Sequence, residues 1–153
     1  MSFIIKQLTT NDLALMHGLL DCFGEAFDEV DTYGANRPNA DYLQDLLCSD
    51  TFIALVALKD DAVVGGLAAY ELKKFEQQRS ELYIYDLAVA ASCRRQSVAT
   101  SLIRSLQPIA RERGAWVIFV QADYIDEPAV NLYEKLGTRE EVLHFDIPIR
   151  VKK

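Results

Sequence analysis

Residues 81–100 read ELYIYDLAVAASCRRQSVAT, and they predict a strand that leads directly into a helix. Aromatic and aliphatic residues alternate over 81–89, as in a strand, and small residues follow at 90–92. Apolar residues then recur at helical spacing over 94–113, and Gly114 is a natural helix stop. The segment therefore predicts one strand-turn-helix unit at the centre of the fold.

The start of that helix is a predicted site for an anion. Unpaired backbone N–H groups and the helix dipole favour negative groups at a helix N-terminus. Arg94 and Arg95 stand at this turn, and the arginine fork suits phosphate oxygens. Neither the glycine pattern of a P-loop nor that of a dinucleotide site is present. From these residues alone, the turn is either a phosphate site or an ordinary turn without a ligand.

The segments on either side predict a mixed sheet with helices packed on it. Before the central unit we expect a strand at 3–8, helices at 13–27 and 39–47, a hairpin of 51–58 and 63–72, and a loop at 73–80. After it we expect a strand at 116–122 that is covered on both faces, a helix from Asp126 to Gly137, and one or two closing strands at 138–149.

Composition and charge limit the classes of function. The 153 residues are enough for one domain, 1–153, and half of them are apolar, as in globular proteins. A net charge of −7 disfavours a nucleic-acid or anionic-membrane partner, since both need a basic face. Residues 21–50 carry eight acids and one base, Arg37. This segment is either a solvated surface or an acidic wall that attracts a cationic ligand.

The cysteines and the hydropathy pattern indicate a cytoplasmic protein. The three cysteines, Cys22, Cys48 and Cys93, form no CxxC pair, so we expect neither a disulfide framework nor a metal site. No apolar run is long enough to span a membrane, and the apolar opening is too short for a signal peptide.

Two motifs resemble those of one enzyme superfamily. Arg94–Ala99 resembles motif A, Q/R-x-x-G-x-G/A, of the GNAT N-acetyltransferases, and Leu87–Val89 resembles the L-x-V that precedes it. AVNLYEKLG at 129–137 is similar to their second motif, A-x-x-L-Y-x-K-x-G. The resemblance implies an α/β (α+β) GNAT-type fold, in which about four helices flank a mixed, mostly antiparallel twisted sheet of six or seven strands. It also implies acetyl-CoA as co-substrate and no metal.

A closer resemblance covers residues 40–146. The runs DYL, TFIAL, KFEQ, RSELYIYDLAV, VQADY and HFDI are similar to those of the aminoglycoside (gentamicin) 3-N-acetyltransferases. This resemblance implies direct acetyl transfer, in a ternary complex, to the 3-amino group of an aminoglycoside, which gives antibiotic resistance; it is also compatible with a homodimer. Two positions depart from the pattern: Ser97 replaces a glycine, and Asp126 stands where many members have asparagine.

The resemblance also implies where the co-substrate binds. Its pyrophosphate would lie on the turn into the helix, and its pantetheine would pair with the strand backbone. Tyr133 occupies the position of the general acid that protonates the leaving thiolate. The residues expected to bind the co-substrate are Leu87, Ala88, Val89, Arg94, Arg95, Gln96, Ser97, Val98, Ala99, Thr100, Asn131 and Tyr133.

On the acceptor side, a carboxylate has to take the proton of the amine. The candidates are Glu81, Asp86 and Asp123, because they lie on or just after the two central strands. Asp86, a charge inside an apolar run, and Glu81 are the expected catalytic carboxylates. Because side chains alternate along a strand, Asp86 is expected on one face of the sheet and Tyr83 and Tyr85 on the other, unless a bulge intervenes. The residues expected to bind the acceptor are Asp28, Asp31, Tyr83, Asp86, Asp123, Tyr124, Glu140, Glu141 and Asp146.

Two other functions remain open from the sequence. The acceptor could instead be a polyamine or a protein amine. Alternatively, the chain binds coenzyme A but does not catalyse acetyl transfer. The argument for this alternative is Ser97, which replaces a glycine of the family pattern in the phosphate turn.

Overall fold

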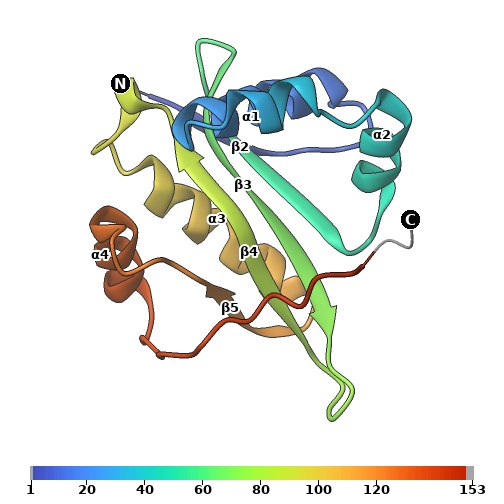
Figure 1. Ribbon diagram of the computed structural model, residues 1–153, viewed down its shortest axis with the longest axis vertical. Helices are drawn as coiled ribbons and strands as arrows, with labels where there is room; N and C mark the ends of the chain where they lie inside the picture. The colour runs from blue at the N-terminus through green and yellow to red at the C-terminus, as the bar shows by residue number, and fades with distance from the viewer. Residues whose placement is uncertain (1, 151–153) are drawn as a thin grey trace. The chain divides into compact units, whose positions relative to one another are not determined.

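The structure is a computed structural model that describes residues 2–150 (Figure 1). The chain divides into two compact units, with the boundary between Gln121 and Ala122. The single domain expected over residues 1–153 stays a prediction.

The first unit contains a five-stranded sheet in the order β1-β2-β3-β4-β5. The strands are β1 (Ile4–Gln7), β2 (Phe52–Lys59), β3 (Ala62–Lys73), β4 (Ser80–Val89) and β5 (Ala115–Val120). Neighbours from β1 to β4 pair antiparallel, whereas β4 and β5 pair parallel. The predicted mixed, mostly antiparallel sheet is confirmed.

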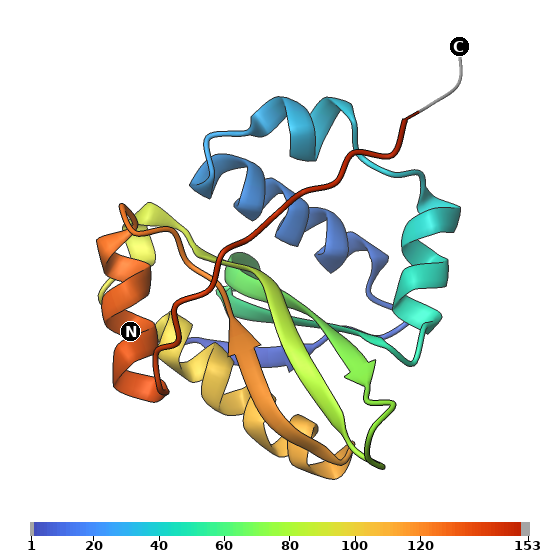
Figure 2. The same ribbon diagram turned by 60° about the horizontal axis from the view of Figure 1, so that its bottom comes forward.

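Helices cover both faces of this sheet. They are α1 (Leu13–Ala26), the short π-helix η1 (Asp31–Ala35), α2 (Ala40–Cys48), the 3-10 turn η2 (Ala91–Cys93) and α3 (Val98–Glu112). Figure 2 shows α1 and α2 on one face and α3 on the other. Leu19 of α1 and Leu43 of α2 pack with Val56 of β2 on the first face. Leu102 and Leu106 of α3 are fully buried on the other face.

A helix cap, a tight turn and a helix stop lie where the sequence predicts them. The side chain of Asn39 accepts a hydrogen bond from the Tyr42 N–H at 2.9 Å and so caps α2. Asp60 and Asp61 both take positive φ, 51° and 63°, as the tight turn between β2 and β3 requires. Gly114, at φ 82°, follows α3, which ends at Glu112.

Three expectations are wrong. The described residues form five strands rather than six or seven, because the exposed segment 138–150 has no strand pairing. The central helix begins at Val98 rather than at 94, because Arg95 and Ser97 take positive φ. The strand at 116–122 is not buried on both faces: Trp116 is 56 % exposed, and the other residues of β5 are only partly buried.

The second unit, described up to residue 150, contains the helix α4 (Glu127–Leu136). The Asp126 side chain accepts a hydrogen bond from the Ala129 N–H, so this departure from the family pattern still caps the helix. Over residues 2–150, every helix is too short or too polar to cross a membrane.

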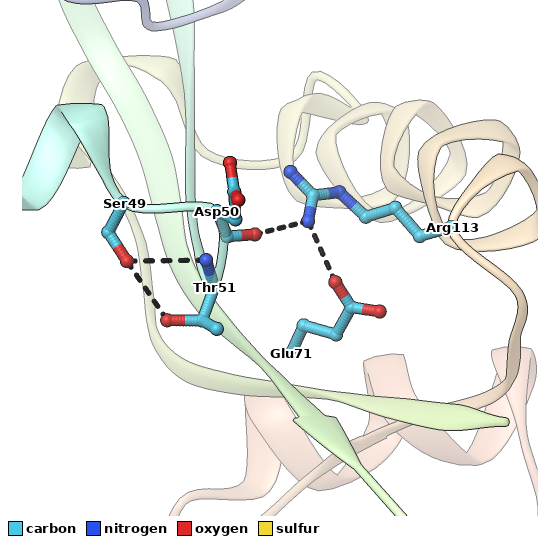
Figure 3. A network of polar contacts seen from close by, with 5 residues as sticks. All are labelled: Ser49, Asp50, Thr51, Glu71 and Arg113. Carbon is cyan, nitrogen blue, oxygen red and sulfur yellow. Dashed lines mark hydrogen bonds and ion pairs between the residues drawn. The ribbon is translucent and has the colours of Figure 1, made fainter. Parts of the chain in front are cut away.

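An ion pair with a buried carboxylate links the end of α3 to the sheet of the first unit (Figure 3). Arg113 donates to the carboxylate of Glu71 on β3 at 2.8 Å, and also to the carbonyl of Asp50. Glu71 is 9 % exposed. Burial alone would raise the pKa of Glu71, but the Ser80 hydroxyl and the Arg113 guanidinium outweigh it, so that the pKa is lowered. The charged form of Glu71 therefore stabilises the fold.

Candidate active site

A bulge in β4 decides which side chains share the acceptor face of the sheet. Ala68 of β3 pairs with Asp86, but the next residue, Ala69, pairs with Ile84. Tyr85 is therefore an extra residue, and the alternation of side chains resets after it. Asp86 consequently lies on the same face as Tyr83 and Tyr85. A strand without a bulge would have placed it on the other face.

One edge of β4 is free of strand pairing beyond the end of β5 within the described first unit. The parallel pairing with β5 runs only from Ser80 to Ile84, where Ile84 faces Val120. Within the described first unit, the backbone of Leu87–Val89 has β3 as its only strand neighbour. A peptide-like chain can add to such an edge through backbone hydrogen bonds. The residues expected to bind the pantetheine lie at this edge, and their role stays a prediction.

The turn after β4 presents backbone donors at the start of α3. The first hydrogen bond of the helix joins the Ser101 N–H to the carbonyl of Ser97. The N–H groups of residues 98–100 therefore make no hydrogen bond within the helix. Ser97 precedes the helix at φ 64° and its side chain makes no cap bond. Arg94 donates to the carbonyl of Val89 at 3.3 Å, which folds this arginine back over the turn. The donors and the arginines form a suitable cradle for a diphosphate.

Asp86 is half-buried and has one specific partner. The hydroxyl of Tyr33, from η1, donates to Asp86 Oδ1 at 3.5 Å. Burial raises the pKa of Asp86, the Tyr33 hydrogen bond opposes this shift, and the charge of Glu29 adds to it. Burial and the charge of Asp86 raise the pKa of Tyr33 to about 12, so Tyr33 keeps its proton at neutral pH. Asp86 is thus a carboxylate with increased basicity and an ordered donor beside it.

Arg37, the single base of the acidic segment, holds η1 in place. Its Nε donates to the carbonyl of Tyr33 at 2.9 Å, and its Nη1 lies 3.1 Å from His17 Nδ1. Its Nη2 pairs with Asp21 at 2.5 Å. Because this cation is used within the segment, exposed acids such as Asp28 and Asp31 leave a net negative surface.

Glu81 lies near the other end of β4. Trp116 Nε1 donates to its carboxylate at 3.0 Å, and Lys74 Nζ lies 3.8 Å from the same group. Glu81 and Asp86 are five positions apart along an extended strand, which corresponds to roughly 15 Å. The structure therefore does not bring the two expected carboxylates together.

Aromatic side chains surround Asp86 on the same face, and sequence analysis missed most of them. Tyr83 stacks on Phe119 of β5 with ring centroids 4.6 Å apart, and Tyr85 meets Tyr70 of β3 at 6.2 Å. The hydroxyl of Tyr83 donates to Gln121 at 3.1 Å. The alternation AAYEL in β3 could have placed Tyr70, but Tyr33 lies in an irregular segment that offers no pattern.

The second unit brings together some of the other expected residues. Tyr124 donates to Glu141 at 2.8 Å, and Arg139 bridges Glu141 and Glu134 at 2.8 and 3.0 Å. Burial, with the charge of Asp126, raises the pKa of Tyr133 on α4 to about 12. The remaining expected residues of this unit lie on α4 or in the segments around it: Asp123, Asn131, Glu140 and Asp146. Asp146 pairs with His144 at 2.8 Å.

Residues 2–150 contain no group of three or more His, Cys, Asp or Glu side chains arranged to hold a metal ion.

Residues 15–138 match the family model described as acetyltransferase (GNAT) family. The chain is 60 % identical to an aminoglycoside acetyltransferase, HMB0005, from an uncultured soil metagenomic sample. The structures superimpose with a TM-score of 0.96 over 98 % of this chain and 100 % of that one. A second such enzyme, meta-AAC0020, also from an uncultured soil metagenomic sample, was solved in complex with trehalose and with sisomicin. It is 32 % and 31 % identical in the two complexes, with a TM-score of 0.90 and 97 % of both chains covered.

Among curated proteins, the probable N-acetyltransferase camello of Xenopus laevis is 32 % identical over 97 residues. These residues are 63 % of this chain and 43 % of camello. The chain thus spans less than half the length of that relative.

Proposed function

Because this chain belongs to the acetyltransferase (GNAT) family, we propose that it transfers the acetyl group of acetyl-CoA to the 3-amino group of a gentamicin-type aminoglycoside. The modification gives resistance to the antibiotic. The observation that carries the proposal is the half-buried Asp86, which the β4 bulge turns onto an aromatic face next to the open strand edge. The similarity to HMB0005 and to meta-AAC0020, the latter solved with sisomicin, supports an aminoglycoside as acceptor.

The reaction would proceed directly in a ternary complex. The backbone of Leu87–Val89 and the start of α3 would hold acetyl-CoA, with the N–H of Leu87 near the carbonyl oxygen that becomes negative. The neutral amine attacks the thioester carbon, so that a C–N bond forms and the C–S bond breaks. Asp86 accepts the proton that leaves the nitrogen, directly or through a water, and Tyr133 gives its proton to the sulfur.

Acceptor choice tests the proposal. Release of coenzyme A thiol would be measured with gentamicin, sisomicin, spermidine and a lysine peptide, and the site of acetylation determined by NMR. We expect the aminoglycosides to have the highest kcat/KM and the product to carry acetyl on the 3-amino group. A higher kcat/KM for spermidine or the peptide would exclude an aminoglycoside as the main acceptor. Coenzyme A binding without thiol release would indicate a module without turnover.

Replacing Tyr133 by phenylalanine should lower kcat by about tenfold and leave the KM of acetyl-CoA nearly unchanged. The effect is modest because a thiolate whose thiol has a pKa near 8.5 also leaves without help. Steady-state kinetics at pH 7.5 measure both constants. A kcat equal to that of the unmodified enzyme would remove Tyr133 from the chemistry.

Ser97→Gly should stabilise the protein by about 1 kcal/mol, because Ser97 has a left-handed φ of 64° that costs a residue with a Cβ more than glycine. Thermal unfolding should show a Tm higher by roughly 2–4 °C. Ser97→Ala is the matched control: it removes the hydroxyl, keeps the Cβ and should give no gain. An equal gain from both variants would assign the effect to the hydroxyl instead of the backbone.

A further inference from the structure

We propose that a row of five aromatic side chains on the same sheet face as Asp86 forms a second subsite, which binds a ring of a multi-ring polyamine other than the ring that is acetylated. This inference rests on the proposed function. We call the five side chains the aromatic row: Phe52, Tyr70, Tyr85, Tyr83 and Phe119.

The aromatic row crosses four strands of the sheet. Consecutive ring centroids are 5.4 Å (Phe52–Tyr70), 6.2 Å (Tyr70–Tyr85), 5.4 Å (Tyr85–Tyr83) and 4.6 Å (Tyr83–Phe119) apart. Strand register produces this order, since Tyr70 pairs with Phe52 on one side and with Tyr83 on the other, and Tyr83 pairs with Phe119. The bulge adds Tyr85 to the same face. The row is therefore built into the pairing of the sheet.

The row is more than a part of the core. Phe52 is 8 % exposed, whereas Tyr85 is 65 % exposed, so the row runs from the packed interior to the surface. An open pocket of about 360 Å³ lies along it, and Tyr70, Tyr83 and Tyr85 line it with Thr51, Glu71 and Leu72. This volume is at the lower end of the range for small-molecule sites, which are typically apolar and aromatic with a few polar groups.

Charge and shape together indicate the class of ligand. The faces of tyrosine rings attract cations and also pack against the apolar faces of saturated rings. Asp86 lies on the same face but serves the acetylated ring as its base, and the carboxylate of Glu71 is already paired with Arg113, so the tyrosine faces are left to hold an ammonium group in the pocket. A cyclic amine satisfies both features, because it has a ring face to stack and an ammonium group. A linear polyamine has no ring face, so the aromatic row should favour multi-ring acceptors.

Two acceptors and three variants test the subsite. The acceptors are sisomicin, which has several rings, and 2-deoxystreptamine, a single aminocyclitol ring. We expect Tyr85→Ala to lower the ratio of kcat/KM for sisomicin to that for 2-deoxystreptamine by about tenfold, from the loss of one stacking ring. Tyr85→Phe keeps the ring and should stay within about twofold of the parent ratio. Phe75→Ala removes a fully exposed aromatic outside the row and should leave the ratio unchanged.

The results separate this inference from the proposed function. An unchanged ratio in Tyr85→Ala, with sisomicin still acetylated by the unmodified enzyme, would overturn the subsite alone. An equal loss in Tyr85→Phe and Tyr85→Ala would also overturn it, because the hydroxyl rather than the ring would then bind the acceptor. If the unmodified enzyme acetylates neither compound, the proposed function fails and the subsite fails with it.

Discussion

Replacing Asp86 by asparagine is expected to lower kcat for an aminoglycoside acceptor by about a thousandfold, the middle of the range for loss of a general base. Asparagine has almost the same shape and can still accept the Tyr33 hydrogen bond, but it cannot take the proton of the amine. Assays of the rate of acetyl transfer from acetyl-CoA to gentamicin would measure the loss of kcat. Asp60→Asn, the same charge change at an exposed turn residue, is the matched control and should keep the parent kcat.

The pH profile gives this prediction a second readout. Burial raises the pKa of Asp86 above its ordinary value of 3.8. Because the base must be deprotonated, kcat/KM should fall more steeply once the pH drops through this raised pKa. This additional fall should disappear in Asp86→Asn, whereas the fall caused by protonation of the acceptor amine should remain. A raised KM with an unchanged kcat would make Asp86 an anchor for the acceptor instead of the base.

Replacing Arg113 by methionine is expected to destabilise the protein by about 3 kcal/mol, since it leaves the buried carboxylate of Glu71 without its cation. The carbonyl of Asp50 also loses its donor. Thermal unfolding should show a Tm lower by roughly 10 °C. The double variant Arg113→Met with Glu71→Gln should recover part of the loss, because it removes the unpaired charge. A double variant that is as unstable as the sum of the two single ones would contradict this pairing.

The contribution of Glu71 to the loss of stability at low pH should be smaller in this variant. In the unmodified protein the pKa of Glu71 is lowered below 4.5, so its contribution is present above that pH and is lost as the pH falls through the folded pKa. Without Arg113, only the Ser80 hydroxyl and the charge of Lys73 oppose burial, so the pKa of Glu71 should be higher than in the unmodified protein. The variant should then lose less stability than the unmodified protein between pH 6 and pH 4, as urea unfolding would show.

Local chemistry explains why most helices and strands could be predicted. The buried stripe Val98, Leu102 and Leu106 of α3 has helical spacing, and Asn39 caps α2 through its own side chain. The predicted start of α3 was wrong because the spacing of apolar residues does not reveal the positive φ angles of Arg95 and Ser97. The missing closing strands have a related reason, since a strand exists only where another strand pairs with it.

For the candidate site, sequence alone determined the chemical inventory: a carboxylate and tyrosines in one central strand, arginines at the next turn, and an excess of acids upstream. It could not decide which of them meet. Asp86 joins the face of Tyr83 and Tyr85 because pairing with β3 inserts one extra residue, and a shift of one residue moves every later side chain to the other face. Tyr33 reaches Asp86 across 53 residues of chain, in a segment that Arg37 links to His17 and Asp21 of α1. Both outcomes depend on contacts between distant residues, which no local pattern encodes.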